Sequence, residues 1–225
     1  MIDKKFARSL DDVMEELIKK LIDYEYIFDD SHFNPENFIR FKKSLLGNIN
    51  VPSTTISPIM ERFLFACSSS YKVRNIVVLG SYFGYALLWL AAGVSNESTP
   101  RVVGIDLNEE ACLSARQNVR RIGLNGVEII CGDAFTVIDN FENNKFDLLF
   151  LDVEKEGSKS AYYPLLEKWL PKLRTEAIIL AHDSSVPKFA EDFKKYHEFV
   201  RDTKRFRKSV SLPLDKCGIE VTRMY

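Results

Sequence analysis

The sequence predicts an α/β fold: a Rossmann-like, seven-stranded, mostly parallel sheet with helices on both faces and an N-terminal helical extension. From Asn75 onward, short runs rich in β-branched residues alternate with helical patterns. Such alternation is typical of a parallel sheet covered by helices. Residues 1–72 instead carry apolar side chains at helical spacing only. We therefore predict a helical extension over residues 1–72, acting as a lid or in dimerisation, and a core domain over residues 73–225.

The helical extension is divided by turn-forming residues. Its apolar positions at helical spacing are Val13, Leu17 and Leu21, then Phe38, Phe41 and Leu45, then Ile59, Phe63, Phe65 and Ala66. Between them lie Asn34-Pro35, Gly47-Asn48 and Val51-Pro52-Ser53. Because proline and Gly-Asn pairs interrupt helices, the pattern predicts separate helices rather than one long helix.

The strands of the core domain are predicted from runs that are short and apolar. These runs cover residues 76–79, 102–105, 127–130, 147–151 and 177–181. Residues 216–225 alternate in and out like a final strand, with residues 209–212 as its partner. Helical patterns over residues 108–122 and 134–141 follow two of the runs, as the fold class requires.

Composition excludes several classes of protein. The chain has 225 residues, of which 46% are hydrophobic and 28% charged, with a net charge of −1. Such a balance gives no electrostatic footprint for nucleic acid or a membrane surface. No apolar run is long enough to span a bilayer, and the start is not a secretory signal. The four cysteines are scattered without a CxxC pair and are interpreted as reduced core thiols, so we expect a cytoplasmic protein.

The most informative segment is the run Asn75 to Tyr85, which predicts a strand, a tight glycine turn and a helix. Turns of this kind hold nucleotide-like ligands in α/β folds. A dinucleotide fingerprint requires glycine where this chain has Tyr82, because the backbone must approach a pyrophosphate there. Gly84 also falls one residue too late for that fingerprint. The turn therefore favours a ligand without pyrophosphate, of which S-adenosylmethionine is the commonest.

Two acids follow the next two predicted strands. Asp106 ends the second run, about twenty residues past the turn, where an acid accepts hydrogen bonds from both hydroxyls of a ribose. The alternative is an acid that only complements the dipole of the following helix. Asp133 ends the third run and either accepts from the amino group of adenine or caps the helix that follows. The two roles of Asp133 are compatible if one carboxylate oxygen caps the helix and the other contacts the ligand.

Further polar residues end the fourth and fifth runs. Asp152 ends the fourth, and His182-Asp183-Ser184 ends the fifth. Because ligands of doubly wound sheets lie at the carboxyl ends of the strands, we expect these residues to converge beside the cofactor. Two carboxylates and a hydroxyl suit Mg²⁺ or Ca²⁺ rather than Zn²⁺. The alternative is that Asp152 is a polar residue at the rim and Asp183 a turn-former.

These residues resemble a known family. The run Gly80-Ser81-Tyr82-Phe83-Gly84-Tyr85 is similar to the G-x-Y-x-G-Y-S turn of class I S-adenosylmethionine-dependent methyltransferases. The nearest group is the cation-dependent small-molecule O-methyltransferases of the catechol and caffeoyl-CoA type. The resemblance extends over residues 55–225, in order and in spacing.

The resemblance implies roles for individual residues. It places Gly80, Tyr82 and Gly84 in the cofactor turn, Asp106 at the ribose, and Asp133 and Ala134 in the adenine segment. We also predict cofactor binding by Ser81, Leu107 and Asp152. The resemblance assigns a divalent cation, Mg²⁺ or another, to Asp152, Asp183 and Ser184. Lys155, in a segment similar to D-x-x-K, would be the general base. Pairing of two chains into a homodimer is likewise expected by resemblance.

The chain also departs from the family pattern. Val78 stands where the family usually has a glutamate, and Ala86 where a serine often holds the methionine carboxylate. Ser184 replaces an asparagine whose amide oxygen completes the metal site. Because a serine hydroxyl is shorter and a poorer donor to a hard cation, the expected metal affinity is weaker.

We accordingly predict transfer of a methyl group from S-adenosylmethionine to a hydroxyl of a small acceptor, phenolic or catechol-like. If no metal takes part, His182 is the alternative base, since imidazole titrates near neutral pH. Two other hypotheses are a metal-independent N- or C-methyltransferase and a cofactor-binding scaffold without turnover. A small-molecule acceptor is the expected partner, with neither nucleic acid nor membrane.

Overall fold

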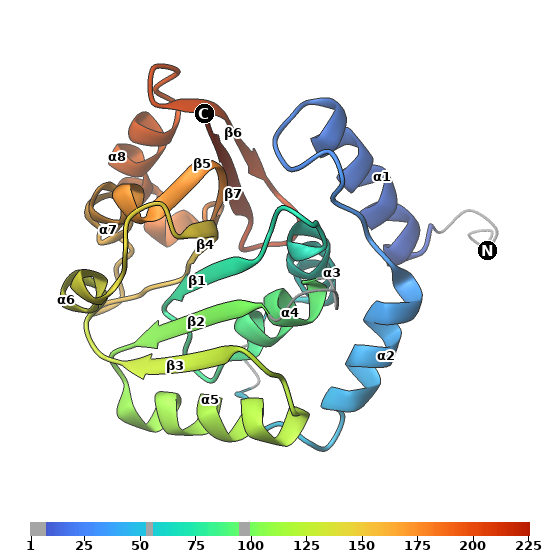
Figure 1. The fold of residues 1–225 in the computed structure, drawn as a ribbon. Helices are drawn as coiled ribbons and strands as arrows, with labels where there is room; N and C mark the ends of the chain where they lie inside the picture. The colour runs from blue at the N-terminus through green and yellow to red at the C-terminus, as the bar shows by residue number, and fades with distance from the viewer. Residues whose placement is uncertain (1–7, 53–55, 95–99) are drawn as a thin grey trace.

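The computed structural model describes residues 8–52, 56–94 and 100–225 and forms an α/β fold (Figure 1). The helices are α1 Leu10–Asp23, α2 Pro35–Leu45, α3 Pro58–Ser68, α4 Tyr85–Gly93, α5 Glu109–Ile122, α6 Ala134–Val137, α7 Tyr162–Trp169 and α8 Ala190–Val200. The strands are β1 Asn75–Leu79, β2 Arg101–Asp106, β3 Val127–Cys131, β4 Phe146–Leu151, β5 Leu173–His182, β6 Phe206–Leu212 and β7 Ile219–Met224. Short 3-10 helices follow α6 and α7 and precede α8, at Ile138–Asn140, Leu170–Lys172 and Pro187–Phe189.

The sheet confirms the predicted fold class. Its seven strands run in the order β3-β2-β1-β4-β5-β7-β6. The first five are parallel, and β7 is antiparallel to both of its neighbours. The order reverses between β1 and β4, and in folds of this class a ligand binds at that reversal.

Strand register brings the carboxyl ends of the central strands level with one another. Leu79 of β1 lies opposite Ile105 of β2 and Leu151 of β4, and Leu151 lies opposite Ala181 of β5. The residue that follows each of these positions therefore emerges at the same edge of the sheet. Asp106, Asp152 and His182 are brought together in this way.

Helices cover both faces of the sheet, as predicted. Figure 1 shows α6, α7 and α8 on one side and α3, α4 and α5 on the other. Alternate residues of β1 pack into the two cores: Ile76 and Val78 into one, Val77 and Leu79 into the other. All four side chains are buried, because a central parallel strand is covered on both faces.

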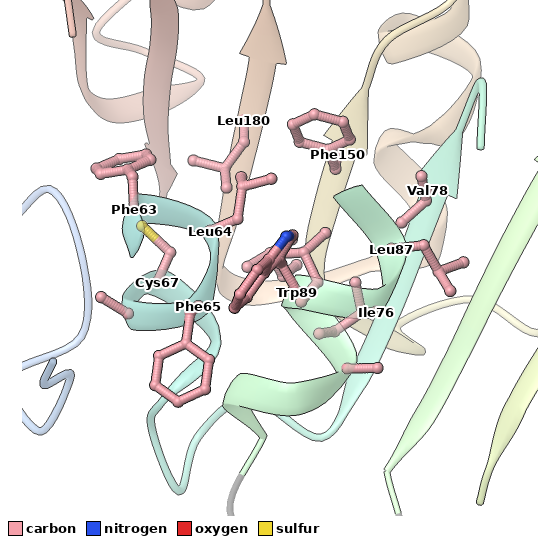
Figure 2. Packing of buried hydrophobic residues seen from close by; sticks show 14 of the residues in the cluster. Phe63, Leu64, Phe65, Cys67, Ile76, Val78, Leu87, Trp89, Phe150 and Leu180 are labelled. Atoms are coloured by element: carbon pink, nitrogen blue, oxygen red, sulfur yellow. The ribbon is translucent and has the colours of Figure 1, made fainter. Parts of the chain in front are cut away.

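The N-terminal helices pack onto the α4 side of the sheet. Phe38 of α2 stacks on Trp89 of α4, with ring centroids 4.7 Å apart, and both side chains are fully buried. Figure 2 shows Trp89 among Leu64 and Phe65 of α3 and Ile76 of the sheet. The predicted division at residue 72 stays a prediction.

Local signals in the sequence explain where the helices begin. Ser9, Asn34 and Ser57 each accept a hydrogen bond from a backbone N–H of the first turn of α1, α2 and α3. Proline is the first residue of both α2 and α3, where its missing N–H costs nothing. Asn108 caps α5 rather than starting it, so the helix begins one residue later than predicted.

The helix predicted over residues 134–141 is shorter than expected. It ends at Val137 and continues as the 3-10 helix to Asn140. Among the helices of the described residues, none has the length and apolar character needed to cross a membrane.

Candidate functional site

The turn between β1 and α4 lies against the end of β4. Gly80 has φ +82°, and a Cβ at this position would lie 2.3 Å from the carbonyl oxygen of Asp152. Only glycine therefore fits. The backbone N–H groups of Gly80 and Ser81 both donate to the carbonyl oxygen of Ile105, at 2.9 and 3.1 Å, which fixes the turn to β2 as well.

The turn continues in left-handed backbone conformations. Tyr82 has φ +45° and Gly84 has φ +85°. A non-glycine residue in this region is strained, and such strain concentrates at functional sites. Gly84 precedes the first turn of α4, and that turn has no side-chain cap. Its N–H groups are thus available to an anionic group, as at other helix N-termini.

Asp106 is held by two backbone hydrogen bonds. Its Oδ2 accepts from the N–H of Tyr82 at 2.7 Å, and its Oδ1 accepts from the N–H of Asn108 at 2.9 Å. A carboxylate has about four acceptor positions, so roughly two remain for the hydroxyls of a ribose. Tyr82 and Leu107 stand beside it with their side chains 49% and 63% exposed. Exposed apolar side chains of this kind can pack against a ring of a bound ligand.

Asp133 is placed next to this group by the end of β3. The N–H of Gly132 donates to the carbonyl oxygen of Asp106 at 2.8 Å, which joins the two strand ends. Asp133 caps α6, since its Oδ1 accepts from the N–H of Phe135 at 2.8 Å. This cap uses one carboxylate oxygen and leaves Oδ2 for the predicted contact with an amino group of adenine. The capping role expected as one alternative is confirmed, and the compatible ligand role stays a prediction.

A second cluster, Asp152, Lys159, His182 and Asp183, lies at the ends of β4 and β5. The Nζ of Lys159 is 2.8 Å from Oδ1 of Asp152 and 2.8 Å from Oδ2 of Asp183. The Nδ1 of His182 is 3.3 Å from Oδ2 of Asp152 and 3.6 Å from Oδ1 of Asp183. We call these four residues the acid–lysine cluster. It contains three of the residues selected from the sequence and one, Lys159, that was not selected.

Lys159 is fixed from both ends. Its side chain is 2% exposed, whereas the Asp152 side chain is 26% exposed. Its backbone N–H donates to Oδ2 of Asp192 on α8 at 2.7 Å. The ammonium also lies 5.4 Å from the ring centroid of Tyr162 and 5.5 Å from that of Phe189. A buried lysine held by two carboxylates and two rings has one defined position.

The charges of this cluster support one another. Burial alone would lower the pKa of Lys159, but Asp152 and Asp183 outweigh it and hold that pKa above its usual value. Burial would raise the pKa of Asp152, yet His182 and Lys159 hold it well below its usual range. Burial would also lower the pKa of His182, but chiefly Asp152 raises it. Lys159 is therefore an ammonium between two carboxylates.

The other predicted residues of this region lie differently. Lys155 is exposed, in a tight turn where its backbone exchanges two 3.0 Å hydrogen bonds with Ser158. Its role as a base stays a prediction. The hydroxyl of Ser184 is buried and has no hydrogen-bond partner among the described residues. The D-x-x-K spacing singled out Lys155, and only the folded chain shows that Lys159, from the same loop, is the lysine that turns inward.

The cluster does not fit a divalent cation. The two carboxylates that would bind it already share the ammonium of Lys159. A divalent ion approaching the same oxygens would be repelled by the ammonium unless the buried lysine side chain moved away. The donor atoms of His182, Asp183 and Cys217 also lie within 4.8 Å of one another. Burial raises the pKa of Cys217 to about 11, so without a metal this thiol is neutral.

The prediction that all four cysteines are core thiols was wrong in part. Cys67 and Cys112 are buried, but Cys217 is only partly buried and Cys131 is exposed at the end of β3. The reason is geometric: a strand end at the ligand edge of the sheet is open, whatever the apolar character of the run.

Known proteins share this sequence pattern and fold. The methyltransferase domain family matches residues 77–184. A catechol O-methyltransferase of Mycobacterium tuberculosis is 26% identical over 60% of this chain and 59% of its own length. A caffeoyl-CoA O-methyltransferase of Stellaria longipes is 22% identical over 64% of this chain and 62% of its own. The chain thus spans about three fifths of the length of these curated relatives.

Solved structures agree with the fold. An O-methyltransferase from Bacillus cereus in complex with SAH has a TM-score of 0.67 at 21% identity, and the match covers 95% of this chain and 99% of that one. At this identity the likeness concerns the fold alone. The resemblance to class I S-adenosylmethionine-dependent O-methyltransferases of the catechol and caffeoyl-CoA type is confirmed.

Proposed function

We propose that this chain, which resembles the S-adenosylmethionine-dependent O-methyltransferases, transfers a methyl group from that cofactor to a hydroxyl of a small acceptor. One observation carries the proposal. The glycine turn, Asp106 and Asp133 stand along one edge of the sheet, and the acid–lysine cluster stands beside them, at the ends of β4 and β5. The residues proposed to bind the cofactor and a polar site for the acceptor are thereby adjacent.

In this proposal the cofactor lies across the ends of β1, β2 and β3. The ribose hydroxyls donate to Asp106, and the adenine amino group donates to Oδ2 of Asp133. Tyr82 and Leu107 cover apolar surface of the ligand, and the methionine carboxylate meets the uncapped N–H groups of α4. Gly80, Ser81, Gly84 and Ala134 contribute backbone and space. Ser81 is buried, and its hydroxyl has no partner among the described residues.

The chemistry is an in-line displacement at the sulfonium methyl. The acceptor oxygen forms a bond to the methyl carbon as the carbon–sulfur bond breaks, and the electron pair of that bond stays on sulfur. The acceptor proton passes to a base. The protein therefore positions the two reactants and takes a proton.

His182 is the proposed base. Asp152 lies 3.3 Å from its Nδ1 and its charge favours a proton there, so the buried Nε2, which has no partner among the described residues, would receive the acceptor proton. Both carboxylates also stabilise the imidazolium that forms. Lys155, the base implied by resemblance, is the alternative, although it stands exposed in its turn. A phenolic or catechol-like acceptor, a homodimer and the absence of nucleic-acid and membrane partners remain part of the proposal.

The proposal is tested first by calorimetry with S-adenosylmethionine. We expect binding by the wild type and a loss of about tenfold or more for Asp106→Ala, since a charge-assisted hydrogen bond contributes roughly 1.5–3 kcal/mol. Glu109→Ala, which removes a neighbouring acid of α5, is the matched control and should bind as the wild type does. No heat at millimolar cofactor would refute the proposal.

Turnover is then followed as S-adenosylhomocysteine released from panels of catechol-like, hydroxycinnamoyl and peptide-bound phenol acceptors. His182→Ala should lose most of the rate while binding the cofactor normally. If Lys155→Ala loses the rate instead, the base is Lys155. Cofactor binding without turnover on any acceptor would favour the scaffold without catalysis.

A further inference from the structure

We infer that the ammonium of Lys159 is the resident cation of the acid–lysine cluster, in the position that a divalent metal would occupy between Asp152 and Asp183. Methyl transfer by this chain then needs no divalent cation. The inference rests on the proposed function and concerns the same site.

The geometry of Lys159 carries the inference. Its Nζ is equidistant, at 2.8 Å, from one oxygen of Asp152 and one oxygen of Asp183. These acids come from two adjacent strands, and no shared turn forces them together. An ammonium placed between them performs the structural task of a bridging metal: it joins the ends of β4 and β5 and neutralises carboxylate charge.

The surroundings of Lys159 show that this position is built. The side chain is almost fully buried, although a lysine is almost never buried unless it is paired. Its loop is tied to α8, since Oδ2 of Asp192 accepts from the N–H of Lys159 at 2.7 Å and from the hydroxyl of Ser158 at 3.0 Å. The ring of Tyr162 faces the ammonium and its hydroxyl reaches the carbonyl oxygens of Leu151 and His182. Helices α7 and α8 thus hold this lysine in place.

The remaining donors argue against a metal as well. Where the family pattern has an asparagine, this chain has Ser184, whose hydroxyl makes no bond to the cluster. A divalent ion would have to displace a buried ammonium from two carboxylates and would gain a weak third ligand. Both the serine at position 184 and the presence of Lys159 therefore argue against a bound divalent cation.

Metal binding is measured directly on the full chain with Mn²⁺, whose free-ion electron paramagnetic resonance signal falls when the ion is bound. We expect the wild type to leave this signal unchanged. Lys159→Met keeps an unbranched apolar stem, one atom shorter, but removes the charge, and it should gain Mn²⁺ binding that Asp183→Asn abolishes in the double variant. Lys194→Met, on the exposed face of α8, is the matched control and should behave as the wild type.

Thermal melting supplies a readout independent of activity. Lys159→Met leaves two acids without their partner, so it should melt below the wild type, and Mn²⁺ should raise its Tm but not that of the wild type. The inference is overturned if wild-type protein binds Mn²⁺ and loses this binding in Asp183→Asn. It is also overturned if folded Lys159→Met gains no binding.

If Lys159→Met does not fold, measurements on the wild-type protein test the inference. Turnover that is unchanged in EDTA, together with no Mn²⁺ binding, supports the inference, and turnover that EDTA abolishes and Mg²⁺ restores overturns it. Calorimetry with S-adenosylmethionine on the same samples keeps the two proposals apart. If the wild type does not bind S-adenosylmethionine, the proposed methyltransferase function is refuted. The Mn²⁺ result separately tests the role of Lys159.

Discussion

Gly80 and Asp152 are in backbone contact: a Cβ added to Gly80 would stand 2.3 Å from the carbonyl oxygen of Asp152 and 2.8 Å from the backbone nitrogen of Val153. The contact joins the cofactor turn to the strand that carries the acid–lysine cluster. Because both partners are backbone, neither can swing aside. The spacing between the two halves of the candidate site therefore depends on the absence of one side chain.

Gly80→Ala should lower the free energy of unfolding and weaken S-adenosylmethionine binding together. Overpacking costs about 1–3 kcal/mol, and the left-handed φ adds roughly 1–2 kcal/mol. Gly123→Ala is the matched control, because Gly123 has φ +73° and no atom of the described residues lies within 4 Å of its added Cβ. It should show the backbone penalty alone, with cofactor binding unchanged. Urea unfolding and calorimetry measure the two effects, and equal losses in both variants would contradict the steric account.

Tyr162→Phe should destabilise the site while keeping the ring in place. The hydroxyl of Tyr162 lies 3.1 Å from the carbonyl oxygen of Leu151 and 3.3 Å from that of His182, and it donates to this pair. Its removal leaves two buried carbonyls short of a donor, at a cost of about 1–3 kcal/mol. Tyr163→Phe, whose exposed hydroxyl donates to Glu167, should cost under about 0.5 kcal/mol in urea unfolding. A rate of methyl transfer unaffected by Tyr162→Phe would show that the β4 and β5 ends are held by other contacts.

Phe38→Ala should be among the most destabilising substitutions in the N-terminal helices. Phe38 is fully buried and stacks on Trp89, and truncation of a buried phenylalanine costs about 3–5 kcal/mol. Ile39→Ala, on the exposed side of the same helix, should change the free energy of unfolding little. If α2 were a detachable lid, Phe38→Ala would instead leave global unfolding unchanged and alter only ligand affinity.

Glu220 should make the protein less stable in acid. It is fully buried on β7, where burial would raise its pKa, but the imidazole of His197, 3.4 Å from Oε2, and hydrogen bonds from Ser209 and Ser211 hold that pKa below its usual value. A carboxyl group with a depressed folded pKa stabilises the fold above its unfolded pKa. This contribution disappears as pH falls through the folded pKa.

Glu220→Gln should therefore be less stable than the wild type at pH 7, and its free energy of unfolding should fall less steeply below about pH 4.5. The check is urea unfolding at a series of pH values. Glu191→Gln removes an exposed carboxyl of α8 and should follow the wild-type curve. Parallel acid limbs for the wild type and Glu220→Gln would show that other carboxyl groups govern the loss.

The cofactor half of the site was readable from local pattern. Gly80, Gly84 and Asp106 belong to one strand–turn–helix–strand succession, and their spacing is set within about thirty residues of chain, as in other α/β ligand-binding units. Register then brings them together automatically, because parallel strands that follow one another place their ends at the same edge. The helix after Asp133 was predicted too long because local pattern does not show where a helix changes its geometry. Its pattern continues past Val137, but the last turn tightens to a 3-10 helix before Phe141.

The sequence by itself determined the order of the strands and helices, the glycine turn and the acids at the strand ends, since each of these depends on neighbours in the chain. Only the tertiary structure decided which cation meets Asp152 and Asp183. Lys155 and Lys159 lie in the same charged loop, and the choice between them depends on Asp192 from α8, which accepts from the N–H of Lys159. Long-range contacts of this kind leave no periodic trace in the sequence. A buried ammonium is held by charges that arrive from separate elements, and only folding brings those charges to one point.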